Sequence, residues 1–331
     1  MYESFFGLTK FPFSTTADPD FLLLTGQHRE ALAGLSYSIA TRRGITILTG
    51  DVGTGKTTLV RRALRYFPEN KICTSVVSNP VLSPPEFLEA VLDGFGLEPV
   101  PPSKTRRLGR LEAYFSVLLE TGHTPALIVD EAHALTFELL EEIRLLGNLE
   151  HGDTKLLSIL LCGQTELDAK LDCQELRQLR QRIAHRFTIG PLRQSEVAPY
   201  VEHRWSKGGG TLPSPFTEEA VRAVANASRG LPRLINTVCD NALLAAFSEQ
   251  SKSITAKHVE TAACDLKLAP AAPQPAAALD PEPEPAATAL PVAAAGRAGQ
   301  ATMTPLRTLS NYHVANESFW TRWAGRLGLA N

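Results

Sequence analysis

Two hydrophobic patterns alternate along the first part of the chain. Short runs in which nearly every residue is apolar predict strands buried on both faces, and longer stretches with apolar residues at every third or fourth position predict amphipathic helices. This alternation is typical of an α/β fold built on a doubly wound parallel sheet. We expect strands at 45–49, 72–77, 125–129, 156–162 and 186–189. We expect helices at about 28–42, 56–66, 84–95, 108–121, 138–149 and 166–184.

The pattern changes near residue 193 and again near residue 269. Over 193–268 the only pattern is that of helices, which predicts a small helical lid. Its helices are expected at 195–206, 218–228, 233–248 and 256–267. Beyond it, repeated Ala and Pro residues cannot bury enough surface to become ordered. We therefore expect five parts: an N-terminal extension that packs on the core (1–43), an α/β domain (44–192), the lid (193–268), an Ala/Pro-rich linker (269–300) and a tail (301–331).

The tail ends in a segment that predicts a short amphipathic helix. Its large apolar side chains share one helical face: Phe319, Trp320, Trp323 and Leu327. A groove on another protein and a membrane interface could both bind such a face, and the alternative is a frayed tail without a partner, because so short a helix is marginal alone. Because only two arginines accompany these aromatic residues, attraction to anionic lipid is weak and we favour the protein groove.

A glycine-rich loop directly follows the first strand and precedes a helix. Its sequence is Gly50-Asp51-Val52-Gly53-Thr54-Gly55-Lys56-Thr57-Thr58. Glycines let the backbone turn successive N–H groups inward, where they bind the α- and β-phosphates of a nucleotide. Lys56 would reach the β- and γ-phosphates, Thr57 would bind Mg²⁺, and Thr58 opens a helix whose N-terminal dipole favours the same anion. We expect this loop to bind ATP with Mg²⁺; a turn that binds nothing is the alternative.

Two acids follow the buried strand at 125–129. Asp130 and Glu131 emerge at the carboxyl edge of the sheet, where ligands of open α/β sheets bind. We expect Asp130 to hold Mg²⁺, directly or through water, and Glu131 to polarise the water that attacks the γ-phosphate. The alternative is an ordinary exposed strand end, and the glycine-rich loop earlier in the chain disfavours it.

Four further polar residues are candidates for the same chemistry. Gln164 ends the strand at 156–162, where it would sense the γ-phosphate or orient water. Arg182 and, as second choice, Arg186 lie at the end of an arginine-rich helix, from which they would reach a neighbouring subunit's nucleotide as an arginine finger; surface salt bridges are the alternative. Arg233 stands in the first turn of a helix, where it opposes the helix dipole, and a bound phosphate would offset that cost; an exposed arginine paired with a carboxylate is the alternative.

Composition says more about the possible binding partners of the protein than about its fold. Lys and Arg number 33 and Asp and Glu 35, so no strong net charge draws the protein to nucleic acid or to an anionic membrane. Five cysteines without a C-x-x-C spacing favour a reducing compartment. We recognise neither a secretion signal nor a long apolar run, and we expect a cytoplasmic protein without a membrane span. One basic cluster is either a solvated face or a nucleic-acid contact: Lys104, Arg106, Arg107 and Arg110.

Together these motifs resemble one family over residues 1–268. The matching residues are Phe5-Phe6-Gly7-Leu8, Pro12-Phe13, Asp18-Pro19, Lys56-Thr57-Thr58 with its loop, Asp130-Glu131-Ala132-His133, Gly163-Gln164, Gln181-Arg182 and Gly230-Leu231-Pro232-Arg233. The family is that of the general secretion pathway protein A (ExeA-like) AAA+ ATPases.

The resemblance implies an AAA+ core with a helical lid, and a homo-oligomer that shares its nucleotide sites between subunits. It implies that ATP hydrolysis drives the assembly or remodelling of a bacterial envelope system for secretion, pili or polysaccharide export. The protein would then be cytoplasmic, or peripheral to the inner membrane, and its tail would bind a protein of that machinery. An ATP-dependent DNA-binding regulator similar to AAA+ proteins of transposition is the alternative, with DNA as partner. A helicase is disfavoured because the chain is too short for a second motor domain.

Overall fold

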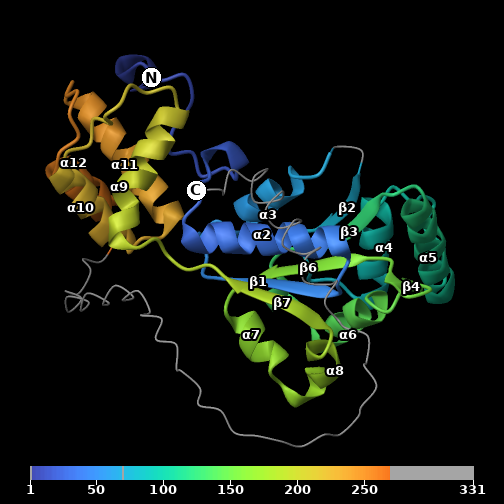
Figure 1. The fold of residues 1–331 in the computed structure, drawn as a ribbon. Coiled ribbons are helices and arrows are strands. Elements are labelled where there is room, and N and C mark those ends of the chain that lie inside the picture. The colour runs from blue at the N-terminus through green and yellow to red at the C-terminus, as the bar shows by residue number, and fades with distance from the viewer. Residues whose placement is uncertain (1, 69–70, 269–331) are drawn as a thin grey trace, which may run out of the picture. The chain divides into compact units, whose positions relative to one another are not determined.

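A five-stranded parallel sheet forms the centre of the fold (Figure 1). The computed structural model describes residues 2–68 and 71–268, which belong to the same compact unit of the chain. The strand order is β2-β3-β6-β1-β7, and all four neighbouring pairs are parallel. The strands are β1 (Ile45–Thr49), β2 (Ile72–Val77), β3 (Thr124–Val129), β6 (Ser158–Gly163) and β7 (Ile183–Thr188). The expected doubly wound α/β fold is therefore confirmed.

Alternate side chains of the strands enter two hydrophobic clusters, one on each face of the sheet. In β3, Leu127 and Val129 join one cluster and Ile128 joins the other, because successive strand residues point to opposite faces. The face of Ile128 is covered by α2 (Gly26–Thr41) and α3 (Lys56–Leu64). The other face is covered by α4 (Pro84–Gly94), α5 (Lys104–Glu120), α6 (Phe137–Leu146), α7 (Glu166–Leu171) and α8 (Arg177–Arg180). Burial on both faces explains why the three central strands, β1, β3 and β6, read as largely apolar runs.

The prediction of one long helix at 166–184 is wrong. The segment is divided into α7, the 3₁₀ turn η3 (Gln174–Leu176) and α8, because the backbone of Cys173 is extended (φ −61°, ψ 150°) and interrupts the helix. The chain then enters β7 at Ile183, which pairs with Ile45 of β1. Strand pairing across the sheet therefore overrides the helical propensity of the last residues in this segment.

Two smaller features also differ from expectation. α5 begins four residues earlier than expected, because the Ser103 side chain accepts a hydrogen bond from the backbone N–H of Arg106 and caps the helix. A short antiparallel hairpin, β4 (Glu150–His151) and β5 (Thr154–Lys155), precedes β6 and was not expected. Each of its strands has only two residues, too few for a pattern of period two to be recognised.

The lid is a helical unit with its own hydrophobic cluster, separate from the two clusters of the sheet. Its apolar positions recur at helical spacing, as in Ile235, Val238, Ala242 and Ala246 of its longest helix. In Figure 1 these helices stand beside one end of the α/β domain. They are α9 (Gln194–Lys207), α10 (Glu218–Ser228), α11 (Pro232–Ser248) and α12 (Ala256–Asp265).

The first residues of the chain pack on the lid and not, as expected, on the core. Helix α1 (Tyr2–Phe6) lies against α11 (Figure 1), where the Tyr2 hydroxyl donates to Asp240. The backbone N–H groups of Thr9 and Lys10 both donate to Gly208 O, at 2.9 and 3.1 Å. Aromatic side chains drive this docking, since the apolar residues of this segment find their partners in the lid cluster.

The chain crosses from the lid to the core after residue 14. Arg61 of α3 donates to the backbone oxygen of Ala17 at 2.8 Å, and Arg65 pairs with Asp20 in the 3₁₀ turn η1 (Pro19–Phe21). Helix α2 then packs on the sheet, as expected for the extension as a whole. We call residues 2–24 the N-terminal strap, because they are attached to the lid at one end and to the core at the other.

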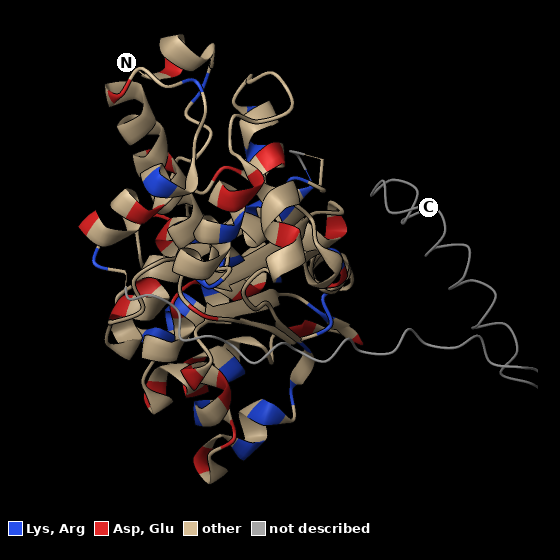
Figure 2. Ribbon diagram, turned by 90° about the vertical axis from the view of Figure 1, so that its left-hand side faces the viewer, with Lys and Arg blue, Asp and Glu red and all other residues tan. Residues whose placement is uncertain are grey.

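The basic cluster at the start of α5 is largely occupied by contacts within the protein. Lys104 pairs with Glu142, and Arg107 donates to the backbone oxygens of Pro85 and Pro101. Arg110 donates to the backbone oxygens of Glu98 and Pro99 within the loop before α5. Acidic and basic residues are interspersed over the described chain (Figure 2). Lys104, Arg107 and Arg110 therefore stabilise the surroundings of this loop, whereas Arg106 is exposed.

Two expectations lie outside the described residues: the linker at 269–300 and the amphipathic helix of the tail. Among the residues that the structure describes, no helix has the length and apolar character needed to cross a membrane.

The attachment of the N-terminal strap to the lid can be tested with two phenylalanines. Phe13 is 1% exposed and meets Phe216 edge to face, whereas Phe11 is 54% exposed. We expect Phe13→Ala to lower the free energy of unfolding by ~3–5 kcal/mol. Phe11→Ala, the matched control, should cost less than ~1.5 kcal/mol. Equilibrium chemical unfolding measures both, and equal losses would contradict the anchoring role of Phe13.

Candidate nucleotide-binding site

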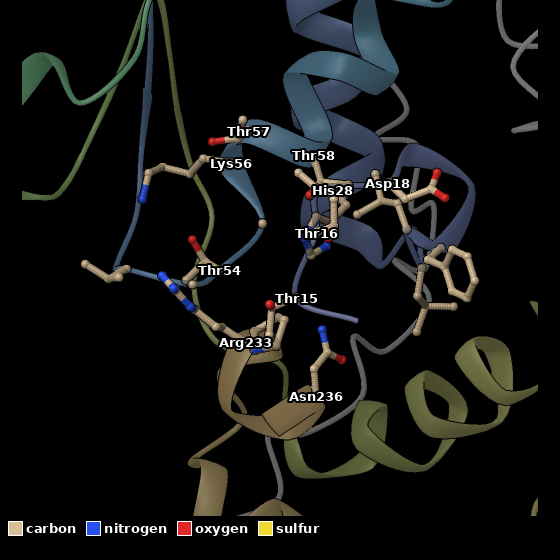
Figure 3. A pocket seen from close by; sticks show the side chains of 18 of the residues that line it. Thr15, Thr16, Asp18, His28, Thr54, Lys56, Thr57, Thr58, Arg233 and Asn236 are labelled. Carbon is tan, nitrogen blue, oxygen red and sulfur yellow. The ribbon is translucent and has the colours of Figure 1, made fainter. Parts of the chain in front are cut away.

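A cavity of ≈ 280 Å³ opens at the carboxyl ends of the strands (Figure 3). Three segments form its walls: the glycine-rich loop with the start of α3, the N-terminal strap, and the start of α11 in the lid. The carboxyl ends of parallel strands meet at one edge of a sheet, so loops distant in sequence converge there. The size and the polar lining suit a ligand of nucleotide size with charged groups.

The glycine-rich loop has the backbone that its sequence predicts. Gly53 (φ 82°) and Gly55 (φ 99°) are in the left-handed region that glycine adopts without strain, and α3 begins at Lys56. A Cβ at Gly50 would lie 2.2 Å from the backbone oxygen of Ile189, so no side chain fits at that position. Val52 to Thr58 line the cavity, whereas Gly50 and Asp51 lie behind it and contribute through their carbonyl groups.

Lys56 is held inside the loop by the loop's own backbone. Its Nζ donates to the backbone oxygens of Gly50 (2.7 Å) and Asp51 (2.9 Å), and the side chain is 8% exposed. Burial lowers the pKa of the Lys56 ammonium, and the nearby Glu131 and Asp130 carboxylates oppose that shift. An anion in the cavity would stabilise the charged form further, because it would supply the opposite charge that the carbonyl groups only partly replace.

Thr57 and Asp130 meet although 73 positions separate them. The Thr57 hydroxyl donates to Asp130 Oδ2 at 2.9 Å, and Asp130 Oδ1 accepts the backbone N–H of Glu131 at 3.0 Å. A hydroxyl and a carboxylate oxygen in contact at the cavity edge are the hard ligands that Mg²⁺ prefers, with further positions left for phosphate and water. The residues present therefore fit the metal ion that the sequence implies.

Glu131 and Gln164 lie at the same edge of the cavity. The backbone of Glu131 is left-handed (φ 51°, ψ 36°), which is costly for a residue with a Cβ and persists only where the surroundings impose it. His133, in the 3₁₀ turn η2 (Ala132–Ala134), lies between the Glu131 carboxylate and the Gln164 amide. The sequence analysis quoted His133 in a motif but assigned it no role.

Arg233 joins the lid to the glycine-rich loop. Its backbone N–H donates to Gly53 O at 3.1 Å, and a Cβ built on Gly53 would lie 2.7 Å from the Arg233 Cβ. The side chain lines the cavity. Gly230 allows this approach, because its φ of 73° and the close Leu192 carbonyl exclude a side chain there. The first turn of α11 is thus seated directly on the loop.

Arg182 and Arg186 do not line the cavity. Arg182 precedes β7 at the amino edge of the sheet, and its backbone oxygen accepts the N–H of Ile45 at 3.3 Å. The glycine-rich loop follows the opposite end of β1, so Arg182 cannot reach the cavity of its own chain. Arg186 lies within β7 and pairs with Asp168 of α7 at 3.3 Å.

The other end of the cavity is formed by residues that the sequence analysis did not predict. From the strap and α2 come Thr15, Thr16, Phe21 and His28, and from the lid come Tyr200, Arg204 and Asn236. The buried guanidinium of Arg204 donates to the backbone oxygens of Pro12 and Ser14 and lies 5.0 Å from the centre of the Phe21 ring. Phe21 lines the cavity, whereas Phe13 packs in the lid.

The contact between Gly53 and the lid can be tested with a substitution that adds a single methyl group at Gly53. We expect Gly53→Ala to weaken binding of a fluorescent ATP analogue at least ~10-fold, equivalent to ~1.4 kcal/mol, because the new Cβ displaces Arg233. Gly7→Ala is the matched control: its φ of 71° imposes similar backbone strain, but nothing lies within 4 Å of the new Cβ. Gly7→Ala should therefore lose stability and keep its affinity. Equal affinities of the two variants would contradict the role of the contact.

Comparison with known proteins agrees with this architecture. A family model described as an AAA domain matches residues 39–171. The General secretion pathway protein A of Aeromonas hydrophila is 40% identical over 271 residues, which cover 80% of this chain and 48% of that protein. The chain thus spans about half the length of this curated relative.

Solved structures show the same fold at low sequence identity. The ORC2 protein of Aeropyrum pernix has a TM-score of 0.60 at 18% identity, covering 78% of this chain and 72% of that one. CDC6P from Pyrobaculum aerophilum has a TM-score of 0.58 at 17% identity, covering 80% and 70%. The chain therefore has the AAA+ P-loop fold, residues 39–171 match an AAA domain, and the sequence resembles General secretion pathway protein A.

Proposed function

We propose that the protein binds ATP with Mg²⁺ in this cavity and hydrolyses its γ-phosphate. One observation carries the proposal: Lys56, Thr57 and Glu131 line the same cavity, and Asp130 is hydrogen-bonded to Thr57. An ammonium group for the phosphates, hard oxygens for the metal ion and a carboxylate for the attacking water are what phosphoryl transfer to water requires.

Each residue then has a distinct role. Lys56 and the N–H groups of the loop bind the phosphates, and Thr57 with Asp130 holds Mg²⁺, which supplies charge neutralisation on the phosphate oxygens. Glu131 accepts the proton of the attacking water. Gln164 orients that water or contacts the γ-phosphate, and Arg233 adds positive charge from the lid. Because Arg233 and Gly53 are in contact, phosphate binding and lid position are linked.

We further propose that hydrolysis drives the assembly or remodelling of a bacterial envelope system. The support is the 40% identity to a protein named for the general secretion pathway. A cytoplasmic position, or a peripheral one at the inner membrane, is in keeping with five free cysteines. The partner would be a protein of that machinery, bound through the tail.

An ATP-dependent DNA-binding regulator is the second candidate, and the geometry favours it less. Three of the four residues of the basic cluster of α5 already bind Glu142 or backbone oxygens of the protein: Lys104, Arg107 and Arg110. Stimulation of ATP turnover by duplex DNA would favour this candidate over the envelope role.

We also propose that nucleotide sites are shared between subunits of a homo-oligomer. The support is the position of Arg182: exposed, and at the edge of the sheet opposite its own loop. From there it serves the site of a neighbour or no site at all. Arg186 is the second choice, since it must first leave Asp168.

The proposed ATPase activity can be tested with two substitutions that separate ATP binding from ATP hydrolysis. We expect Lys56→Ala to weaken ATP binding at least ~100-fold, equivalent to ~2.7 kcal/mol, because the buried ammonium no longer meets the phosphates. Glu131→Gln should keep the affinity and lower kcat by ~10²–10⁴, because only a carboxylate accepts the proton of water. Titration of a fluorescent ATP analogue and phosphate release measure the two effects.

The matched control for these variants is Lys104→Ala, a lysine of α5 that pairs with Glu142 outside the cavity. It should bind and hydrolyse ATP like the wild type. Wild-type turnover in Glu131→Gln would rule out the assigned base.

Sharing of sites can be tested by mixing inactive variants. Arg182→Ala should bind ATP normally and lose ~10³-fold in kcat, since an arginine finger acts only on the transition state. Mixed with Lys56→Ala, it should regain turnover, because some interfaces then combine an intact loop with an intact arginine. Arg180→Ala, two residues earlier and paired with Asp172, is the control and should stay active. Constant specific activity down to a demonstrated monomer would refute shared sites.

A further inference from the structure

His133 connects the two polar groups that face the γ-phosphate end of the cavity. Its Nδ1 lies 3.4 Å from Glu131 Oε2, and its Nε2 lies 3.1 Å from the Gln164 amide nitrogen. Glu131 and Gln164 both line the cavity, but His133 does not. The imidazole ring thus stands behind the two groups and touches each of them.

The contact with Glu131 favours a proton on Nδ1 of the ring. With the proton on Nδ1, the ring donates toward the Glu131 carboxylate, and Nε2 accepts from the Gln164 amide. With the proton on Nε2, the Gln164 side chain would have to turn its amide oxygen toward the ring. Nδ1 would then accept the Gln164 backbone N–H at 3.4 Å but present a lone pair to the Glu131 carboxylate. The first tautomer makes both side-chain contacts favourable.

The backbone holds His133 in this place. Lys170 of α7 donates to the backbone oxygens of His133 and Leu135, which fixes the turn η2 against α7. The left-handed Glu131 immediately before this turn aims its carboxylate at the ring, at a cost in backbone strain. Strain that is imposed by the surroundings at a cavity edge is the kind of feature that positions a reacting group.

We propose that His133 is a positioning residue: it orients the Glu131 carboxylate and links that orientation to the position of the Gln164 amide. When a γ-phosphate or a water molecule engages Gln164, the amide changes its bond to Nε2, and the ring transmits this change to the general base. This inference rests on the proposed ATPase function and deepens it. The 3.4 Å contact to Glu131 is long for a hydrogen bond, and such contacts commonly shorten once substrate is bound.

The first test separates turnover from binding. We expect His133→Ala to lower kcat by about 10- to 100-fold, because a small misplacement of a reacting group costs that much in rate. The dissociation constant of a fluorescent ATP analogue should stay within about twofold of the wild type, since the ring does not line the cavity. His123→Ala is the matched control: His123 precedes β3, at the opposite edge of the sheet, and should leave both quantities unchanged.

Two conservative variants separate the two contacts of the ring. The amide nitrogen of asparagine can occupy the place of Nδ1, and the amide of glutamine can occupy the place of Nε2. His133→Asn therefore keeps a donor for Glu131 and should recover much of the rate lost in His133→Ala. His133→Gln keeps only the contact to Gln164 and should recover less. A merely structural role would make recovery follow folding stability and not the position of the amide.

A double-mutant cycle tests the link to Gln164. If the ring acts through that amide, the kcat of the double variant His133→Ala/Gln164→Ala should be about that of the slower single variant. The proposal would be overturned if the kcat losses of the two single variants multiplied in the double variant. Wild-type kcat or weakened ATP binding in His133→Ala would overturn it as well. Failure of the ATPase assignment would look different, because the wild type would then release no more phosphate than Lys56→Ala.

Discussion

Parallel pairing in the middle of the sheet determines where Lys56, Asp130, Glu131 and Gln164 lie. β6 stands between β1 and β3, and all three run in the same direction. The glycine-rich loop after β1, the acids after β3 and Gln164 after β6 consequently leave the sheet at one edge. The hydrogen bond between Thr57 and Asp130 is the direct result. Reversal of any of these strands would separate the groups by the length of a strand.

The cavity depends equally on elements outside the sheet. Arg233 reaches the loop because Gly53 lacks a Cβ and Gly230 can turn the chain beside Leu192. The N-terminal strap adds a third wall, held to the lid by Arg204 and to α3 by Arg61. A ligand that touches all three walls stabilises their arrangement by mass action, so its binding and the position of the lid are thermodynamically coupled.

Because the strands are parallel, their amino ends meet at the opposite edge of the sheet, which carries Arg182. Arg182 emerges there because β7 runs parallel to β1, and no path within the chain brings it to its own loop. The buried Lys56 and the exposed Arg182 are therefore at opposite edges of one sheet. In the proposed homo-oligomer, the amino edge of one copy would meet the carboxyl edge of another, and Arg182 would then act at its neighbour's site.

The sequence alone determined the features that depend on residues close together in the chain: the glycine-rich loop, the buried strands and the edge of the sheet at which the acids lie. Gly53, Gly55 and Lys56 predict the loop because backbone freedom and helix start are properties of a few consecutive residues. Apolar runs predict strands buried on both faces, and the position of Asp130 and Glu131 after such a run predicts the edge at which they lie.

The tertiary structure decided what depends on residues distant in sequence. The segment at 166–184 has the composition of a helix, yet Ile183 enters a strand because β1 offers it a partner. The strap packs on the lid because its aromatic side chains find an apolar cluster there, and no local pattern identifies that cluster. Arg204 and Asn236 line the cavity, and His133 touches Gln164, only because separate elements are brought within a few ångströms. Periodicity records which face of an element is buried, but packing between elements selects the partner of that face, since apolar surfaces attract without direction.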